Sequence, residues 1–371
     1  MKTLCLLPVA SDARIQRRLA ALRSRGLDLD VLSFDRQYYA GKALPGGYRS
    51  LGHISHGNLV KRVPAIARAV PAVRAAAAQA DVIYAFGSDL LALAWLATRG
   101  VRRRPRIVYE VADIHPVLVG EGFQARAMRA FERHLVRQIS LMVVTSKAFI
   151  TEFYEGIQQV SGLSYELVEN KPELGNVVRG DRPVRSPGDP LVIGYFGVIR
   201  CERSWTVLTR LAAAAGGRVR VLVRGVPLGI QSFHDDVAAC PWIEYGGPYT
   251  APDDLAGMYR SVDAAWIAHR VDDNNSLLWN RLNRFYESCA FQTPMIAQTG
   301  TQDAKVVSEL GLGVCLDLAD VDDAVGRLLS LSRRDLDGPA LNVGRLPRRV
   351  YAECGEHDHL MSRIRALAHA V

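Results

Sequence analysis

The chain has 371 residues, of which 49% are hydrophobic and 23% charged, as is typical of a soluble globular protein with about two domains. No run of about 20 apolar residues occurs, so no transmembrane helix is expected. The net charge of +8 is unevenly placed: residues 1–150 hold 23 Lys and Arg against 10 Asp and Glu, whereas the remainder holds 23 against 28.

The basic first half predicts an anionic partner for that half. A nucleic acid is not expected, because no reader motif or set of base-stacking aromatics occurs. Residues 59–79 place Val63, Ile66, Val70 and Val73 between basic residues, as in a helix that lies on an anionic membrane, although two prolines argue against one continuous helix. An ordinary solvated helix face is the alternative.

Hydrophobic segments alternate between strand and helix patterns along the first half. Strands are expected at 2–9, 29–34, 81–86, 106–111 and 140–145, and helices at 12–26, 88–99 and 122–138. The opening residues therefore predict a first strand rather than a signal peptide. This alternation predicts an α/β domain over residues 1–175, with a parallel sheet covered on both faces.

A Pro-, Gly- and Arg-rich stretch, 179–190, predicts a linker. A second domain is expected over 190–354, with strands at 191–197, 218–223, 242–246, 263–269 and 295–297. Residues 355–371 predict a terminal helix that packs back on the first domain. The six scattered cysteines form no CxxC pair and predict buried thiols in a reducing cytosol.

Polar residues that follow the strands are the candidate site residues, because ligands of such sheets bind at the carboxyl ends of the strands. Asp113 and His115 follow one strand and could orient or deprotonate a hydroxyl group. Asp12 and Arg14 follow the first strand. One alternative is that Asp113 caps the following turn and His115 is only a polar residue at the surface. The other is that Asp12 caps a helix and Arg14 forms a salt bridge.

The strand expected at 191–197 ends in Gly197 and is followed by Arg200, Arg203 and a helix, an arrangement suited to phosphate binding. Pairing of these arginines with Glu202 or solvent is the alternative. No GxGxxG or GxxxxGK[ST] motif supports NAD or P-loop binding. Asp272 and Asp273 raise the possibility of a metal site, but no His or Cys cluster has ligand spacing, so neither metal nor cofactor is expected.

The run NRFYESCAFQTPMIA, residues 283–297, resembles the sugar-nucleotide segment of GT-B glycosyltransferases of family four. The resembling residues are Arg284, Glu287, Pro294 and Ala297. On local grounds alone, Arg284 and Glu287 could be a surface ion pair. The loops around Asp12, Asp113, Asn170, Gly197 and Tyr249 also resemble segments of that family in order and spacing. Gln292 and Trp279 depart from it, standing where it has a glycine and a first glutamate.

The resemblance implies two Rossmann-like domains facing across a cleft, and a role for each candidate residue. Glu287 would bind the ribose of a nucleoside-diphosphate sugar, UDP-sugar above all, and basic side chains its diphosphate. The residues implied on the donor side are Gly197, Arg200, Arg203, Tyr249, Asn283, Arg284 and Glu287. Asp113 and His115 would be catalytic, and Asp12 and Arg14 would line the acceptor site.

The implied activity is transfer of a sugar to a lipid-linked or saccharide acceptor in exopolysaccharide or lipopolysaccharide assembly. The enzyme would be cytoplasmic and peripheral at the inner face of the membrane, bound through its basic domain. A GT-B epimerase that needs no acceptor is one alternative. A catalytically inactive binding module is the other, and the departure at Trp279 keeps it open.

Overall fold

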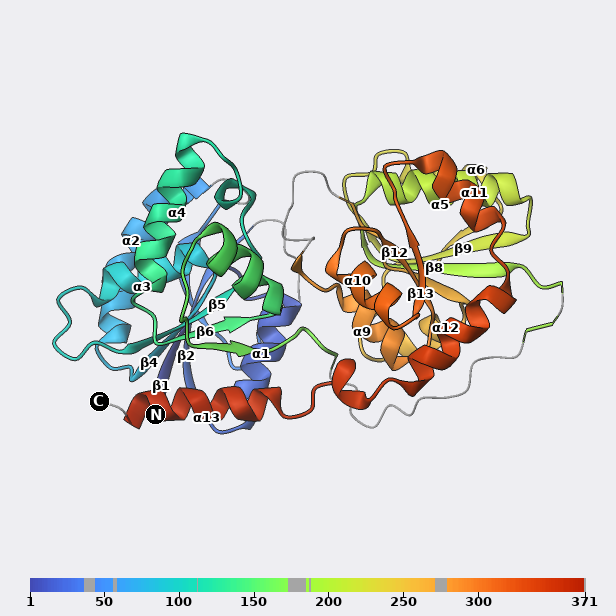
Figure 1. Cartoon of the computed structure of the whole chain (residues 1–371). Coiled ribbons are helices and arrows are strands. Elements are labelled where there is room, and N and C mark those ends of the chain that lie inside the picture. The colour runs from blue at the N-terminus through green and yellow to red at the C-terminus, as the bar shows by residue number, and fades with distance from the viewer. Residues whose placement is uncertain are drawn as a thin grey trace. The chain divides into compact units, whose positions relative to one another are not determined.

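A computed structural model describes residues 1–36, 44–55, 59–111, 113–172, 185–186, 188–270 and 279–369. The chain forms two compact units, one of Met1–Glu169 with Gly355–Val371 and the other of Asn170–Cys354. Each unit is built on its own parallel β-sheet with helices on both faces (Figure 1). The fold prediction of two doubly wound parallel-sheet domains is therefore confirmed.

The first unit contains a seven-stranded sheet in the order β3-β2-β1-β4-β5-β6-β7. Its strands are β1 (Lys2–Leu7), β2 (Asp28–Asp35), β3 (Arg49–His53), β4 (Val82–Phe86), β5 (Arg106–Val111), β6 (Leu141–Val144) and β7 (Tyr165–Leu167). Its helices are α1 (Ala13–Ser24), α2 (Leu59–Ala77), α3 (Ser88–Thr98), η1 (Pro116–Leu118), α4 (Phe123–Val136), the π-helix η2 (Phe149–Ile157) and α13 (Glu356–His369). Figure 1 shows α2, α3 and α4 on one side of the sheet and α1 and α13 on the other.

The terminal helix α13 belongs to the core of the first unit. Leu360, Met361 and Ile364 are buried together with α1 and the central strands. On its polar side, Asp358 forms an ion pair with Arg25 of the same unit, with 2.6 Å between Oδ1 and Nε. The last helix of the chain therefore completes the fold of the first unit.

The second unit contains a six-stranded sheet in the order β10-β9-β8-β11-β12-β13. Its strands are β8 (Leu191–Ile199), β9 (Val219–Pro227), β10 (Ile243–Tyr245), β11 (Ala264–Trp266), β12 (Met295–Gln298) and β13 (Gly313–Leu316). Its helices are α5 (Glu202–Ala215), α6 (Phe233–Ala239), α7 (Leu255–Arg260), α9 (Asn283–Ala290), α10 (Gln302–Glu309), α11 (Val321–Leu329), α12 (Arg333–Arg345) and η3 (Arg348–Val350). Helices α5, α6 and α11 bury one face of this sheet, and α7, α9 and α10 bury the other.

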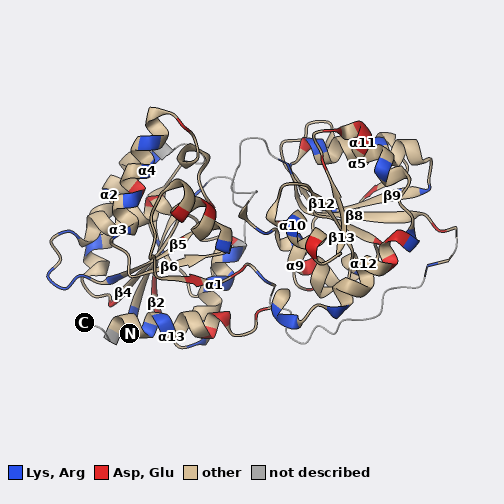
Figure 2. Cartoon of the chain, viewed as in Figure 1, with Lys and Arg blue, Asp and Glu red and all other residues tan. Residues whose placement is uncertain are grey.

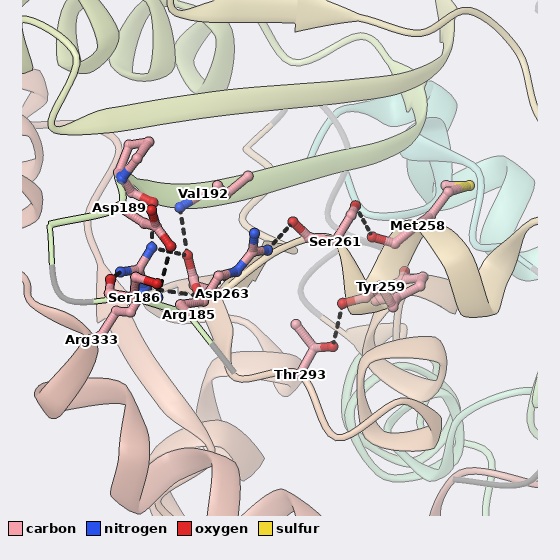
Figure 3. Close-up of polar contacts among 11 residues, drawn as sticks. Arg185, Ser186, Asp189, Val192, Met258, Tyr259, Ser261, Asp263, Thr293 and Arg333 are labelled. Atoms are coloured by element: carbon pink, nitrogen blue, oxygen red, sulfur yellow. Dashed lines mark hydrogen bonds and ion pairs between the residues drawn. The ribbon is translucent and has the colours of Figure 1, made fainter. Parts of the chain in front are cut away.

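A buried aspartate organises the amino-terminal edge of the second sheet (Figure 3). Asp263 is 3% exposed, and its Oδ2 accepts the amide of Val192 in β8 at 2.8 Å. Arg333, the first residue of α12, donates its Nε to Asp263 Oδ1 at 3.2 Å. Because a buried carboxylate needs such partners, these contacts fix the start of β8, β11 and α12 together.

Several local predictions are wrong for identifiable reasons. Strand β8 does not end at Gly197 but runs to Ile199. Helix α2 is continuous although Pro64 and Pro71 lie inside it, because Ala65, Ala69 and Val73 are buried and α2 packs along α3. Cys354 is exposed, and Cys240 and Cys315 are only half-buried.

The predicted membrane face of α2 is largely occupied by the protein itself. Val73 is fully buried and Ile66 and Val70 are half-buried, whereas Val63 is 60% exposed. Arg62 forms an ion pair with Asp89 at 2.8 Å, so part of the basic pattern is structural. Among the described helices, none is both long and apolar enough to cross a membrane.

Candidate functional site

A pocket in the second unit lies at the carboxyl ends of β8 and β11. These neighbouring strands mark the point where the strand order reverses, which is where open α/β sheets bind ligands. The pocket has a volume of about 450 Å³, within the range of small-molecule sites. It is lined by Asn170, Phe196, Gly197, Val198, Arg200, Gly225, Val226, Pro248, Tyr249, His269, Asn280, Arg281, Leu282, Asn283, Arg284 and Glu287.

Two glycines form the wall where β8 meets β9. Gly197 and Gly225 are register partners, with φ of +100° and +137°. A Cβ atom at Gly225 would lie 1.8 Å from the carbonyl oxygen of Gly197, so no side chain fits there. The sheet edge therefore presents bare backbone to the pocket, which allows a ligand to approach closely.

Glu287 is a buried carboxylate in the pocket wall. It lies in α9, is 6% exposed, and its Oε2 accepts the hydroxyl of Tyr259 at 2.7 Å. The hydroxyl of Thr293 in turn donates to the carbonyl of Tyr259 at 3.2 Å, which ties α7 to the turn after α9 (Figure 3). The burial of Glu287 rules out an ordinary surface ion pair and gives its carboxylate a fixed orientation.

Three arginines, Arg200, Arg281 and Arg284, supply positive charge to the same pocket. Arg284 Nη1 donates to the carbonyl of Trp266 at 3.1 Å, and its guanidinium lies 5.1 Å from the ring centroid of Tyr195. Arg200 is exposed, and no carboxylate of the described residues pairs with it. Arg284, held by these contacts, and the exposed Arg200 together supply positive charge that suits a phosphate group.

The pocket also contains a histidine that the sequence did not single out. His269 is 5% exposed, and neither ring nitrogen has a hydrogen-bond partner among the described residues. Burial, followed by the charges of Arg284 and Arg200, lowers its pKa to about 3, so the imidazole is neutral at neutral pH. A neutral ring with unpaired nitrogens in a pocket wall can give a ligand one donor and one acceptor.

Most of the predicted donor-side residues meet in this pocket. Asn283 accepts a hydrogen bond through Oδ1 from Asn170 Nδ2 at 2.7 Å, and both residues line the pocket. Arg203 is not among the lining residues; it lies in the first turn of α5. The start of α5, which is capped by the Cys201 side chain, does not line the pocket either. Residues at the start of α9 line it instead.

At position 292, where the family that the sequence resembles has a glycine, the backbone has a conformation that suits glycine. Gln292 has φ of +58°, in the left-handed region that glycine adopts without cost. The turn that ends α9 before Pro294 therefore keeps its shape although the glycine is absent.

In the first unit, Asp12 and Arg14 lie after β1, at the carboxyl edge of the sheet. Asp12 Oδ1 accepts the amides of Arg14 and Ile15 at 2.9 and 3.0 Å, so this carboxylate caps α1. Arg14 Nη1 lies 3.7 Å from Oε1 of Glu110, a fully buried residue that sequence reasoning missed. Arg18 also pairs with Glu110, with 3.1 Å between Nε and Oε2.

The charge of Glu110 is held by its partners. Burial alone would raise its pKa, but the charges of Arg18 and Arg14 and the hydrogen bond from Tyr84 outweigh burial, and the pKa lies below its usual value. Glu110 is therefore ionised at neutral pH and fixes both arginines at the sheet edge. A carboxylate inside the run RIVYEV carries no periodic signal, which explains why sequence reasoning missed it.

Asp113 and His115 follow β5 at the same edge of that sheet. Asp113 is exposed, whereas His115 is half-buried and accepts the Val117 amide through Nδ1 at 3.3 Å. Because Nδ1 accepts this bond, the neutral ring carries its proton on Nε2. His115 can therefore donate a hydrogen bond from Nε2, and Asp113 can accept one.

The metal alternative at Asp272 and Asp273 lies outside the described residues. Among the residues that are described, no three His, Cys, Asp or Glu side chains are grouped to hold a metal ion.

Comparisons with known proteins agree with this geometry. Residues 11–158 match the family described as Glycosyl transferase 4-like domain. The two parallel-sheet units have the architecture of the GT-B fold. The succinoglycan biosynthesis protein ExoL of Rhizobium meliloti is 30% identical over 323 residues, which cover 84% of this chain and 80% of that protein. The chain therefore belongs to the family-four-like GT-B glycosyltransferases.

Solved structures share the fold over the whole chain. Sucrose-phosphate synthase from Thermosynechococcus elongatus has a TM-score of 0.72 at 15% identity and covers 100% of both chains. Anabaena HepE in complex with UDP and glucose has a TM-score of 0.69 at 15% identity, covering 99% of this chain and 100% of that chain.

Proposed function

We propose that this glycosyltransferase transfers a sugar from a nucleoside-diphosphate sugar, UDP-sugar above all, which binds in the pocket of the second unit. The observation that carries the proposal is a buried carboxylate, Glu287, in one pocket of about 450 Å³ with the guanidinium groups of Arg200 and Arg284. The UDP and glucose held by Anabaena HepE, which shares the fold, support UDP as the first nucleotide to test.

In this proposal Glu287 accepts hydrogen bonds from the ribose hydroxyls. A carboxylate is an acceptor with two oxygens, and its bonds to hydroxyls are about twice as strong as neutral ones. Tyr259 contributes by orienting Oε2 through its bond of 2.7 Å. The backbone of the Pro248–Tyr249 loop, also in the lining, would hold the base.

Arg200 and Arg284 neutralise the diphosphate, whose charge increases as its bond to the sugar breaks. Guanidinium groups fixed before the reaction stabilise that developing charge. The bare backbone at Gly197 and Gly225 lets the phosphates approach, and the first turn of α9 offers its amides to an anion. Arg203, outside the lining, has no part in the proposal. No metal or cofactor is needed, so transfer should survive EDTA.

The acceptor is proposed to bind at the carboxyl edge of the first unit. Asp113 would take the proton of the attacking hydroxyl, while His115 Nε2 would donate a hydrogen bond that orients it. Arg14, held by Glu110, would supply charge for an acidic or phosphorylated acceptor. The name of the relative ExoL, a succinoglycan biosynthesis protein, supports a role in polysaccharide synthesis. For this role we propose a saccharide or lipid-linked acceptor at the cytoplasmic face of the membrane.

Nucleotide binding is tested first by thermal shift with UDP, GDP, ADP and dTDP. We expect a shift with one nucleotide that disappears in Glu287→Gln and persists in Glu309→Gln, a control change at an exposed position of α10. The proposal fails if no nucleotide shifts the wild type, or if both variants respond like it.

Transfer is then tested with a labelled sugar nucleotide and membrane lipid extract. Label in a lipid-extractable product, with nucleoside diphosphate released only when acceptor is present, supports transfer. Epimerised sugar nucleotide without acceptor would favour the epimerase, and binding without either reaction would favour an inactive binding module.

A further inference from the structure

A second depression lies in the first unit, at the amino-terminal edge of its sheet. Its volume is about 370 Å³, and it is lined by Trp95, Arg99, Arg104, His134, Arg137 and Gln138. These residues come from the ends of α3 and α4 and from the segment before β5. The candidate acceptor residues follow β1 and β5 at the opposite edge, so this depression, the Trp95 pocket, belongs to neither substrate site described above.

The walls of the Trp95 pocket are held in place by hydrogen bonds. Gln138 Oε1 accepts from Trp95 Nε1 at 3.0 Å and from Arg104 Nη2 at 3.3 Å. Its Nε2 lies 2.7 Å from His134 Nε2, which must therefore be the acceptor. Arg99 lies over the Trp95 ring, 4.6 Å from its centroid. The pocket thus has an ordered aromatic floor with guanidinium groups around it.

The Trp95 pocket carries positive charge that the protein does not neutralise. Three guanidinium groups line it, there is no carboxylate in the lining, and no carboxylate of the described residues pairs with Arg99, Arg104 or Arg137. Arg99 is the C-cap residue of α3 only through its backbone N–H, which donates to the Leu96 carbonyl. The guanidinium that donates to the Leu96 and Ala97 carbonyls is that of Arg74. Like charges held together repel one another, and an anion with several oxygens would relieve that repulsion.

Exposed aromatic rings lie along α4, whose last turn contributes to the pocket. Phe131 of α4 is 42% exposed and makes an edge contact with Trp95, with centroids 6.4 Å apart. Phe123, at the start of the same helix, is 81% exposed. Three arginines, Arg126, Arg129 and Arg133, lie along α4 (blue in Figure 2). Exposed aromatic rings beside basic side chains are typical of a surface that lies in the membrane interface.

We propose that the Trp95 pocket binds the phosphate of an anionic membrane lipid while Phe123 and Phe131 enter the interface. The proposal rests on the membrane association put forward above and places its contact on α3 and α4 rather than on α2. Guanidinium groups match phosphate oxygens bidentately, and the apolar rings account for a lipid rather than a soluble phosphate.

The test is flotation with vesicles of phosphatidylglycerol in phosphatidylcholine, using the full chain. Arg104→Gln/Arg137→Gln should weaken binding about 25-fold, since each arginine near an anionic surface contributes about 1 kcal/mol. The matched control, Arg68→Gln/Arg103→Gln, removes the same charge from exposed positions of the unit outside the pocket and should weaken it less than fivefold. Phe123→Ser/Phe131→Ser should also reduce binding.

Three outcomes would overturn the proposal. Equal losses in both arginine pairs would show attraction by net charge without a pocket, and no loss in either would exclude the site. The third outcome is no flotation together with binding of inorganic pyrophosphate at micromolar concentration, measured as quenching of tryptophan fluorescence that Trp95→Phe abolishes. That result would assign the pocket to a soluble phosphate. The UDP-induced thermal shift should remain in every variant, which separates failure of this proposal from failure of the donor site.

Discussion

Replacing Tyr259 with Phe tests whether the donor carboxylate is oriented in advance. The change removes only the hydroxyl that donates to Glu287 Oε2 at 2.7 Å. A hydrogen bond to a charged group contributes about 1.5–3 kcal/mol. Here the change would take one hydrogen bond away from a carboxylate whose residue is only 6% exposed. For a unit of this size that corresponds to a fall in Tm of roughly 4–10 °C.

The same change should weaken UDP binding about three- to tenfold, because a mobile carboxylate binds the ribose less well. The matched control is Tyr154→Phe in the first unit, where a buried hydroxyl also donates to a buried glutamate, Glu132, over 3.4 Å. It should lower Tm without changing UDP affinity. Calorimetric titration gives both affinities. The reasoning is refuted if Tyr259→Phe binds UDP as the wild type does, or if both variants lose affinity equally.

Three further predictions concern buried groups. Burial raises the pKa of Glu132 from 4.5 to about 7 in the folded protein, which therefore keeps a proton that the unfolded chain loses, and the free energy of unfolding should fall by roughly 3 kcal/mol as the pH rises from about 4.5 to 7. Urea titrations of Glu132→Gln should show a smaller fall, and the same pH dependence as in the wild type would contradict this prediction. Gly225→Ala should lower the free energy of unfolding by several kcal/mol, because its Cβ would lie 1.8 Å from the Gly197 carbonyl oxygen, whereas the control Gly229→Ala, at φ +82° in open space, should lower it by about 1 kcal/mol. Similar melting temperatures for the two variants would count against the strand geometry. His269→Leu should raise the Tm of the unliganded protein, because it removes two buried nitrogens without partners among the described residues, and it should weaken UDP binding two- to tenfold. A lower Tm with unchanged UDP affinity would exclude His269 from the site.

Sequence patterns predicted those elements whose signal is local. The apolar runs before Asp113 and up to Gly197 are buried strands, and the carboxyl-edge rule placed their following loops correctly. Strand β3 was not predicted because most of its residues, RSLGH, are exposed and show no alternation. Strand β3 pairs in parallel with β2, so its extended conformation depends on that neighbour rather than on its own residue pattern.

The pocket that we propose for the donor was only partly predictable. Glu287 and Arg284 were found because a family motif surrounds them, and both line the pocket. His269 was missed because its environment depends on Arg284 and Arg200, which are distant from it in the sequence. Arg203 has the right spacing but lies in the first turn of α5, outside the pocket lining, because β8 continues two residues beyond the predicted glycine end.

The central claim is that a buried carboxylate in the second unit binds the ribose of a sugar nucleotide. Calorimetric titration of UDP into the wild type and Glu287→Gln tests it most directly. The account predicts one site per chain in the wild type and an affinity at least tenfold weaker in the variant, because charged acceptors bind hydroxyls more strongly than neutral ones. Equal affinities, or no heat of binding with any of the four nucleotides, would contradict it.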